Sequence, residues 1–318
     1  MLSAAMRFDP LQAQKFRAAG WWTEETLSTW LERQVQERPA GLAVRAGAQT
    51  LTYGELAQQA ERLAAALATL GLRAGDVVAV QLPNLPEFLL TYLAVCRLGG
   101  VLTTLHLPYR EAELEALLRH SRARAVVCLP AVKDFPAAAT LLALRRRLPG
   151  LAHVLVLGEA PAGALSFSEL LAAAPARFTG PPPTAEAPFL LLYTSGTTAS
   201  PKAVPLSYQT MLSNARLSAP DFRLTAADVL LSAAPFTHLF GLYSVHLALW
   251  SGACQALLPA FSPDALVATL ARSRATVLFA APAHLPACVP ASSMPTTWRR
   301  CACSSSLAAP VPRGWYRT

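Results

Sequence analysis

Short apolar runs alternate with helical patterns along most of the chain, and this alternation constrains the fold more than any other feature of the sequence. The run at residues 77–82 is mostly apolar, as expected for a strand that is buried on both faces of a sheet. The next segment, 87–98, has the length and apolar spacing of a helix. Repetition of this order predicts βαβ units, in which parallel strands form a sheet covered by helices.

The alternation occurs in two sets, which predicts an α/β protein with two sheet subdomains of similar design. The expected strands are residues 43–46, 49–52, 77–82, 101–105, 125–129, 154–157, 189–193, 229–233, 254–258 and 276–280. The expected helices are residues 24–38, 87–98, 111–121, 137–148, 208–217, 242–250 and 265–272, and a further helix follows Thr52. A stretch rich in proline and alanine, 174–188, is either a linker or a long crossing loop.

The helix after Thr52 has the clearest local signals in the sequence. Thr52 and Glu55 have the spacing of a capping box, in which each side chain accepts a hydrogen bond from the other residue's backbone N–H. Gly71 suits the position just after the helix, where a positive φ is common. One face between them is apolar and is formed by Leu56, Ala60, Leu63, Leu67 and Leu70.

The net charge of +8 leaves two interpretations open. Several arginines lie near the ends of expected helices, where solvated cations also complement the helix dipole. They are Arg119, Arg122, Arg124, Arg145, Arg146 and Arg147. The alternative is a patch that binds an acidic substrate or partner. No stretch interleaves basic and aromatic residues, so we expect no nucleic-acid partner.

We expect a cytoplasmic protein with no membrane span and no metal site. No Asp, Glu, Lys or Arg occurs between Asp228 and Asp264, but prolines and glycines divide this segment, so buried strands and helices explain it better than a span does. The six cysteines lack a zinc spacing and fit a reduced compartment. The first twenty residues lack the apolar region of a signal peptide. The sequence sets no oligomeric state.

The run Y-T-S-G-T-T-A-S-P-K-A-V, residues 193–204, is the motif with the most chemical content. It follows an expected strand and precedes an expected helix, and its glycine is surrounded by hydroxyl residues. These residues are Thr194, Ser195, Gly196, Thr197 and Thr198, and Lys202 follows them. Such a loop can hold phosphate oxygens with backbone N–H groups and hydroxyls while the lysine adds positive charge. A plain polar turn is the other interpretation, and the spacing of a Walker A loop is absent.

The same run resembles the phosphate-binding loop of the adenylate-forming superfamily, which includes acyl-CoA synthetases, aryl-acid ligases, peptide-synthetase adenylation domains and luciferases. Other segments resemble further elements of these enzymes, and the resemblance covers roughly residues 20 to 290. They are L-T-Y-G-E-L at 51–56, G-D-V-V-A-V at 75–80 with Asn84 and Glu87 after it, C-R-L-G-G-V at 96–101 and P-F-T-H-L-F-G-L at 235–242.

The resemblance implies ATP-dependent activation of a carboxylic acid to an acyl-adenylate, with coenzyme A as the acceptor of the acyl group. It assigns ATP phosphates to Thr194, Ser195, Gly196, Thr197, Thr198 and Lys202, and it places His238 near the acid. Aryl-acid ligases usually carry asparagine where this chain has Leu239, so a hydrophobic acyl or alicyclic acid is the expected substrate. The aromatic and aliphatic residues Phe240, Leu242 and Tyr243 either shape an acyl pocket or belong to the core.

The chain also departs from the family pattern. Alanine replaces the usual glycine at Ala199 and Ala203, which would add strain wherever the loop needs a positive φ. The G-x-T-E element for ATP and Mg²⁺, the ribose aspartate, the hinge and the late catalytic lysine are not recognisable. We therefore expect little or no turnover from this truncated chain, and the alternative is a catalytically dead remnant that binds a nucleotide or an acid, or a product without function.

The expected organisation has three parts. Residues 1–22 form an N-terminal extension, 23–291 an incomplete AMP-binding large domain, and 292–318 an atypical tail. The tail lacks periodicity, and the run 298–306 resembles no buried strand. A frame slip in the gene would explain this tail, and the encoding DNA would show it.

Overall fold

The computed structural model describes residues 8–194, 202–284 and 300–303. Contacts between Cα atoms divide the chain into two compact units. Unit 1 comprises residues 1–28, 58–82 and 87–213, and unit 2 comprises residues 29–57, 83–86 and 214–318. Each unit has its own sheet, so the prediction of an α/β protein with two sheet subdomains is confirmed.

Unit 1 contains a seven-stranded sheet in the order β7-β6-β5-β3-β4-β8-β9. Its strands are β3 (Val77–Gln81), β4 (Val101–Thr104), β5 (Ala125–Cys128), β6 (His153–Val156), β7 (Leu165–Ser166), β8 (Pro188–Thr194) and β9 (Lys202–Ser207). Its helices are α2 (Pro10–Ala18), the main part of α4 (Tyr53–Thr69), α5 (Pro86–Leu98), α6 (Glu111–Ser121), α7 (Ala137–Arg145), α8 (Phe167–Ala173) and the start of α9 (Tyr208–Phe222). All neighbouring pairs are parallel except β8 and β9.

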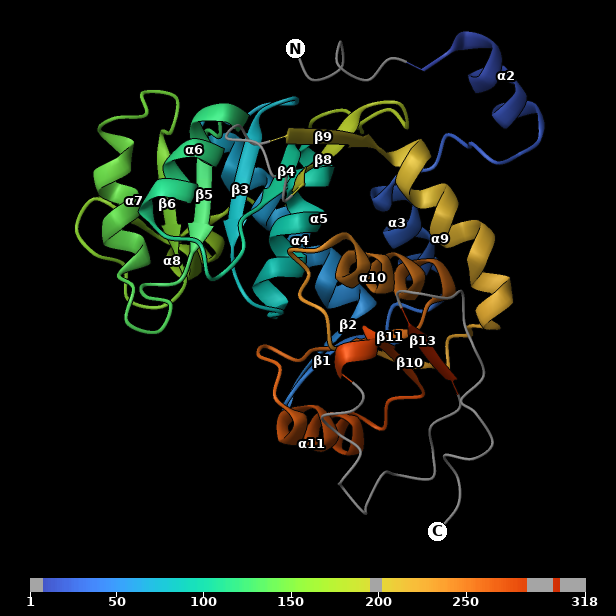
Figure 1. The fold of residues 1–318 in the computed structure, drawn as a ribbon. Helices are drawn as coiled ribbons and strands as arrows, with labels where there is room; N and C mark the ends of the chain where they lie inside the picture. The colour runs from blue at the N-terminus through green and yellow to red at the C-terminus, as the bar shows by residue number, and fades with distance from the viewer. Residues whose placement is uncertain (1–7, 195–201, 285–299, 304–318) are drawn as a thin grey trace. The chain divides into compact units, whose positions relative to one another are not determined.

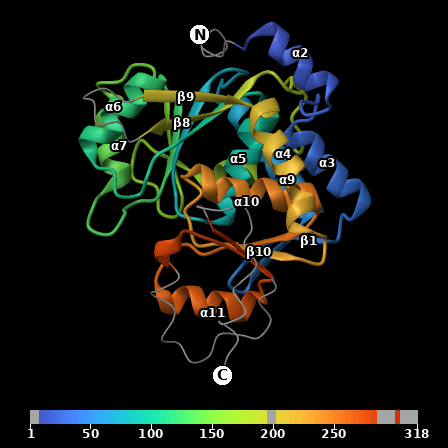
Figure 2. The same ribbon diagram turned by 45° about the vertical axis from the view of Figure 1, so that its right-hand side comes forward.

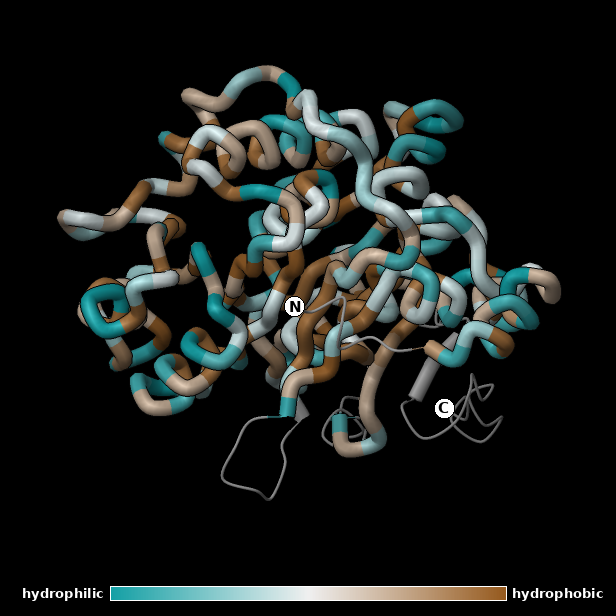
Figure 3. Tube along the Cα trace, turned by 90° about the horizontal axis from the view of Figure 1, so that it is seen from above, coloured by the Kyte–Doolittle hydropathy of each residue, from teal (hydrophilic) through white to brown (hydrophobic). Residues whose placement is uncertain are grey.

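Alternate strand residues of this sheet face opposite layers of helices. One face packs against α6 and α7, whose leucines form a continuous cluster with Val77, Ala79, Val126 and Val154. The intervening residues, such as Val78 and Val80, are also fully buried, as expected for parallel strands covered on both sides. Figure 1 shows α6 and α7 beside β5 and β6, and Figure 3 shows hydrophobic segments interspersed with hydrophilic ones along the chain.

The segment rich in proline and alanine is a crossing loop of unit 1. Arg97 holds it, because its guanidinium donates to the carbonyl oxygens of Phe178 and Gly180 and lies 5.0 Å from the centre of the Phe178 ring. Glu61 accepts a 2.6 Å hydrogen bond from Arg97 Nε and another from the backbone N–H of Phe178. Of the two interpretations of residues 174–188, the structure therefore supports the packed loop over the linker.

Unit 2 contains a six-stranded sheet in the order β13-β12-β10-β11-β1-β2. Its strands are β1 (Leu42–Ala46), β2 (Gln49–Thr52), β10 (Val229–Ser232), β11 (Cys254–Ala256), β12 (Val277–Ala280) and β13 (Arg300–Cys303). Its helices are most of α3 (Leu27–Glu37), the start of α4, the end of α9, α10 (Leu239–Ser251) and α11 (Pro263–Ser273), with a short 3₁₀ turn at Pro282–His284.

Two helices cover opposite faces of the sheet in unit 2. Leu266 and Leu270 of α11 pack against Leu231 and Leu278 of the strands. The next residue of β12, Phe279, points to the other face and meets Phe240 and Tyr243 of α10. Figure 2 shows α10 and α11 on either side of these strands.

The local signals of α4 are confirmed. Glu55 accepts a 2.8 Å bond from Thr52 N–H, and Thr52 Oγ1 accepts one of 3.2 Å from Glu55 N–H, which is the predicted capping box. The backbone bond from Thr52 lowers the pKa of the Glu55 carboxyl below its ordinary value. Gly71 has φ +84°, as expected for the residue after a helix.

Two strands differ from the sequence prediction. β9 lies between the hydroxyl-rich loop and α9, so the loop does not lead directly into a helix. β13, a strand that the sequence analysis did not expect, pairs in parallel with β12, with Arg300 opposite Val277 and Cys303 opposite Ala280. Pairing with an existing neighbour explains both, because strand formation depends on partners that are remote in sequence. No helix in the described part of the chain is long and apolar enough to cross a membrane.

Acidification is expected to destabilise unit 2 through His246 of α10. This side chain is fully buried, and desolvation lowers its pKa to about 3. Below pH ~6.5 the unfolded chain binds a proton that the folded chain does not, so stability falls by about 1.4 kcal/mol per pH unit, or about 2 kcal/mol between pH 6.5 and 5. Urea unfolding at several pH values measures this slope. His246→Leu removes the titration and should flatten the slope, and an equal slope in both proteins would contradict the assignment.

Candidate functional site

The hydroxyl-rich loop connects two antiparallel strands of unit 1. Thr194 at the end of β8 pairs with Lys202 at the start of β9, so residues 195–201 close a hairpin between these two positions. Ser195, Gly196, Thr197 and Thr198 lie outside the described residues. Because β8 runs parallel to β4, the loop begins at the carboxyl end of a parallel strand. Ligands of open α/β sheets commonly bind at this edge.

Lys202 is exposed at the start of the edge strand β9. It makes no ion pair with any residue that the structure describes, so its positive charge is not neutralised there. Pro205 lies further along the same strand, where its missing N–H is tolerated because an edge strand has an unpaired side. The hairpin therefore presents one cation next to the loop.

Buried aromatic rings anchor the hairpin to unit 1. The ring of Phe189 in β8 stacks on Tyr208 at a centroid distance of 4.1 Å and an interplanar angle of 14°, and Tyr208 donates to the carbonyl oxygen of Cys96. Tyr193 OH lies 3.0 Å from Nδ1 of His120, and burial raises the pKa of this phenol to about 12. These contacts hold β8 near both of its ends, and β9 is held by its pairing with β8.

Ala203 is free of the strain that replacement of a glycine could introduce. It lies in the extended strand β9, opposite Tyr193, and its φ is not positive. Its methyl group packs against the main core cluster of unit 1, where a glycine would leave the space unfilled. Ala199, the other alanine in place of a usual glycine, lies outside the described residues.

The second predicted site element, residues 235–242, belongs to unit 2. His238 is the N-cap residue of α10, and its backbone N–H donates to the carbonyl oxygen of Pro235 at 3.0 Å. Its side chain is exposed, although the protein around it desolvates the imidazole enough to lower the pKa. A neutral imidazole is therefore favoured near pH 7, and it would meet a carboxylate as a hydrogen-bond donor.

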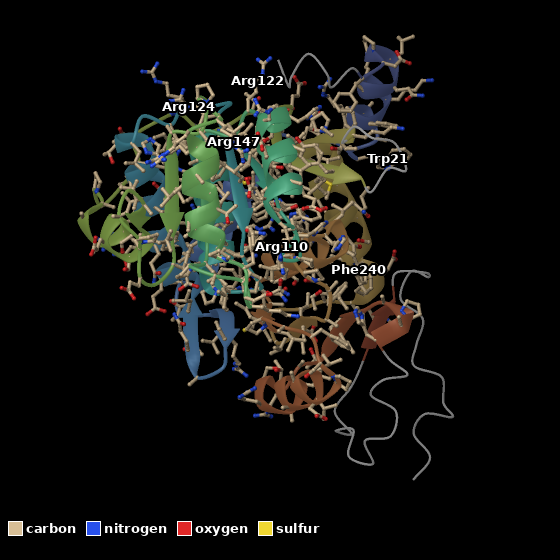
Figure 4. The ribbon with its side chains drawn as sticks, turned by 60° about the vertical axis from the view of Figure 1, so that its left-hand side comes forward. Trp21, Arg110, Arg122, Arg124, Arg147 and Phe240 are labelled. Atoms are coloured by element: carbon tan, nitrogen blue, oxygen red, sulfur yellow. The ribbon has the colours of Figure 1, made fainter. Side chains whose placement is uncertain are left out.

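The aromatic residues after His238 pack inside unit 2. Phe240 and Tyr243 make edge contacts with Phe279 at centroid distances of 5.9 and 6.1 Å, and Figure 4 shows where Phe240 lies. The hydroxyl groups of Tyr243 and Ser218 are hydrogen-bonded. Leu242 is fully buried, whereas Leu239 is exposed. Of the residues expected to shape a pocket or the core, Leu242 belongs to the core and Phe240 and Tyr243 border it.

The arginine-rich surface belongs to unit 1. Arg119 and Arg147 form ion pairs with Glu115, and Arg147 also pairs with Glu111. Figure 4 shows Arg122, Arg124 and Arg147 in the upper part of the view and Arg110 below them. These contacts support the interpretation of a solvated face that is partly neutralised by acidic neighbours.

Unit 1 thus contributes the hydroxyl-rich hairpin, and unit 2 contributes the His238 element. Among the described residues, no group of three or more His, Cys, Asp or Glu side chains could hold a metal ion. The cysteines Cys96, Cys128 and Cys254 are free and buried, as expected for core residues.

Comparisons with known proteins agree with the resemblance. The sequence profile of a family described as AMP-binding enzyme matches residues 31–317. Salicyl-AMP ligase / salicyl-S-ArCP synthetase from Mycobacterium tuberculosis is 36% identical over 292 residues, which is 89% of this chain and 51% of that protein. Medium-chain fatty-acid–CoA ligase from Escherichia coli is 30% identical over 285 residues, which is 88% of this chain and 50% of that protein. The chain thus spans about half the length of these relatives.

A solved structure shows the same fold. The apo structure of MbtA from Mycobacterium smegmatis superposes with a TM-score of 0.87 at 35% sequence identity, covering 95% of this chain and 56% of that chain. The family match ends at residue 317, inside the segment 292–318.

Proposed function

The chain belongs to the AMP-binding enzyme family, and from this premise we propose that it carries the ATP- and acid-binding part of an enzyme that converts a carboxylic acid into an acyl-adenylate. Its fold is that of the N-terminal domain of adenylate-forming enzymes. The observation that supports the proposal best is the hairpin. Its loop has the hydroxyl-rich sequence of a phosphate-binding loop, begins at the carboxyl end of a parallel strand and ends at the exposed Lys202.

In the proposed reaction an oxygen of the substrate carboxylate attacks the α-phosphorus of ATP. The bond from this phosphorus to the bridging oxygen breaks, and pyrophosphate leaves with the electron pair. Such a step depends mainly on positioning and on neutralisation of the phosphate charge. Backbone N–H groups and hydroxyls of residues 194–198 would hold the phosphates, and the Lys202 ammonium would offset the charge of the leaving group. His238 would orient the carboxylate through a neutral N–H.

Enzymes of the family use Mg²⁺ together with ATP. Among the described residues no group of three or more His, Cys, Asp or Glu side chains could hold a metal ion, and Mg²⁺ that binds with a nucleotide takes most of its ligands from phosphates and water. We assign it no ligand in this chain, and no step of the proposal passes through it.

We propose a hydrophobic carboxylic acid as substrate and the thiol of coenzyme A as acceptor of the acyl group. Leu239 and Phe240 follow His238 directly and supply apolar surface, with no polar group to read a ring hydroxyl. The relatives include both an aryl-AMP ligase and a fatty-acid–CoA ligase, so the assay needs acids of both classes.

ATP binding and acid-dependent pyrophosphate exchange test the proposal on the full 318-residue chain. We expect saturable ATP binding by calorimetry and, at most, weak exchange of labelled pyrophosphate into ATP that requires a hydrophobic acid, with hexanoate, cyclohexanecarboxylate, benzoate and salicylate as the panel. Binding without exchange would support the alternative of a catalytically dead nucleotide- or acid-binding protein. A folded chain that binds neither ATP nor any acid of the panel would overturn both.

A further inference from the structure

Asn84 has both ends of its amide bonded to the loop that leads to His238. Its Nδ2 donates to the carbonyl oxygen of Ala234 at 3.1 Å, and its Oδ1 accepts a 2.7 Å bond from the backbone N–H of Phe236. The side chain is 3% exposed and belongs with its segment, 83–86, to unit 2. One rigid planar group therefore fixes two peptide groups of the loop at a set spacing.

Further bonds make this loop stiff. Ser232 Oγ donates to the same carbonyl of Ala234 at 3.0 Å. The backbone N–H of His238 donates to the carbonyl oxygen of Pro235, which belongs to the same peptide group as the Phe236 N–H that bonds to Asn84. A movement of the Asn84 amide would thus be passed to His238 through a single peptide group.

The first turn of α10 fits closely against the same loop. A Cβ atom added at Gly241 would lie 2.2 Å from the carbonyl oxygen of Pro235 and 2.7 Å from its carbonyl carbon. Only glycine permits this approach, so the loop backbone and the start of the helix are in direct contact. The position of the loop therefore sets the position of His238, the N-cap residue of this helix.

We propose that Asn84 is a positioning residue of the acid site, because it holds the loop that places the His238 imidazole. The inference rests on the proposed function in one respect, namely the role of His238 at the substrate carboxylate. Asn84 itself is buried and has both ends of its amide bonded to backbone, so it acts through His238 and not on the substrate.

Three variants of the full chain test the role. Asn84→Ala removes both bonds to the loop, and Ser232→Ala removes one bond with a smaller change in volume. The matched control is Gln255→Leu, which removes another buried amide of unit 2 that donates to the carbonyls of Leu230 and Ala256 without touching residues 234–238. A role limited to stability predicts similar behaviour for Asn84→Ala and the control.

The first readout is the protonation midpoint of the His238 ring, followed by NMR and assigned with His238→Gln. We expect a value below the ordinary ~6.5 in the wild-type chain. It should rise toward that value in Asn84→Ala, rise less in Ser232→Ala and stay unchanged in Gln255→Leu. The second readout is the KM for the acid in pyrophosphate exchange, which should increase roughly tenfold in Asn84→Ala because two hydrogen bonds that orient the loop are lost. The Kd for ATP should change less than twofold.

The outcomes separate the inference from the proposed function. If the wild-type chain shows no acid-dependent exchange, the proposed function fails, and the NMR midpoint still decides whether Asn84 positions His238. If Asn84→Ala does not fold, the protonation midpoint of His238 in Ser232→Ala decides whether the loop positions this ring. An unchanged midpoint in a folded variant, or the same shift in Gln255→Leu, would overturn the role of Asn84.

Discussion

Replacement of Phe189 by alanine is expected to lower the free energy of unfolding by about 3–5 kcal/mol, the usual range for a buried phenylalanine. The ring of Phe189 is fully buried in β8, between Tyr208 at 4.1 Å and Tyr92 at 6.1 Å. Tyr92 and Tyr208 are themselves among the largest buried side chains. Because three large rings are in contact, the neighbours cannot close the space without leaving their own positions.

Urea unfolding followed by tryptophan fluorescence measures this effect. Phe261→Ala is the matched control, because its ring is 40% exposed and the same truncation there should cost less than about 1 kcal/mol. A loss below about 1 kcal/mol in Phe189→Ala would show that the stack contributes little to unit 1. A loss in the expected range would show that the base of the hairpin is held by core packing.

Most of the fold could be predicted because its signals are local. The capping box, the apolar spacing and Gly71 lie within α4 or next to its ends, and the structure contains each of them. The buried parallel strands were predictable for a similar reason, since a strand covered on both faces needs a continuous apolar run.

The strands β9 and β13 could not be predicted because their local sequences do not favour a strand. β9 contains Pro205 and begins with a lysine, and β13 begins with Arg300. Each forms by pairing with a neighbour, β8 for the first and β12 for the second. Polar residues and proline suit the edge positions that both strands occupy.

In the candidate site, too, some features could be predicted from the sequence and others could not. Lys202 and His238 stand out in the sequence because they lie in motifs that resemble a known family. Asn84 also lies in a segment that resembles the family, but its contacts leave no signal in the sequence, since the hydrogen bonds join residues 150 and 152 positions apart. A lone asparagine after a strand predicts a turn. Only the folded chain brings its amide to the His238 loop.

The loss of the Lys202 ammonium is expected to raise the Kd for ATP by roughly ten- to hundredfold, the effect of a charge-assisted hydrogen bond of about 1.5–3 kcal/mol. Lys202 is exposed at the start of β9 and directly follows the hydroxyl-rich loop in sequence. No anion among the described residues pairs with it, so a bound triphosphate would be its first strong partner. If exchange is measurable, its rate should fall by about a hundredfold, because the lysine also offsets charge on the departing pyrophosphate.

Calorimetry with ATP on Lys202→Ala, Lys202→Arg and Lys15→Ala distinguishes a specific contact from a general effect of charge. Lys202→Arg keeps the positive charge and should retain most of the affinity. Lys15→Ala removes an exposed lysine of α2 and should bind ATP as the wild-type chain does. The free energy of unfolding should be nearly equal in all four proteins, since neither lysine is buried. Equal ATP affinity in Lys202→Ala and the wild type would remove this residue from the phosphate site, and equal losses in both alanine variants would reduce its role to long-range electrostatics.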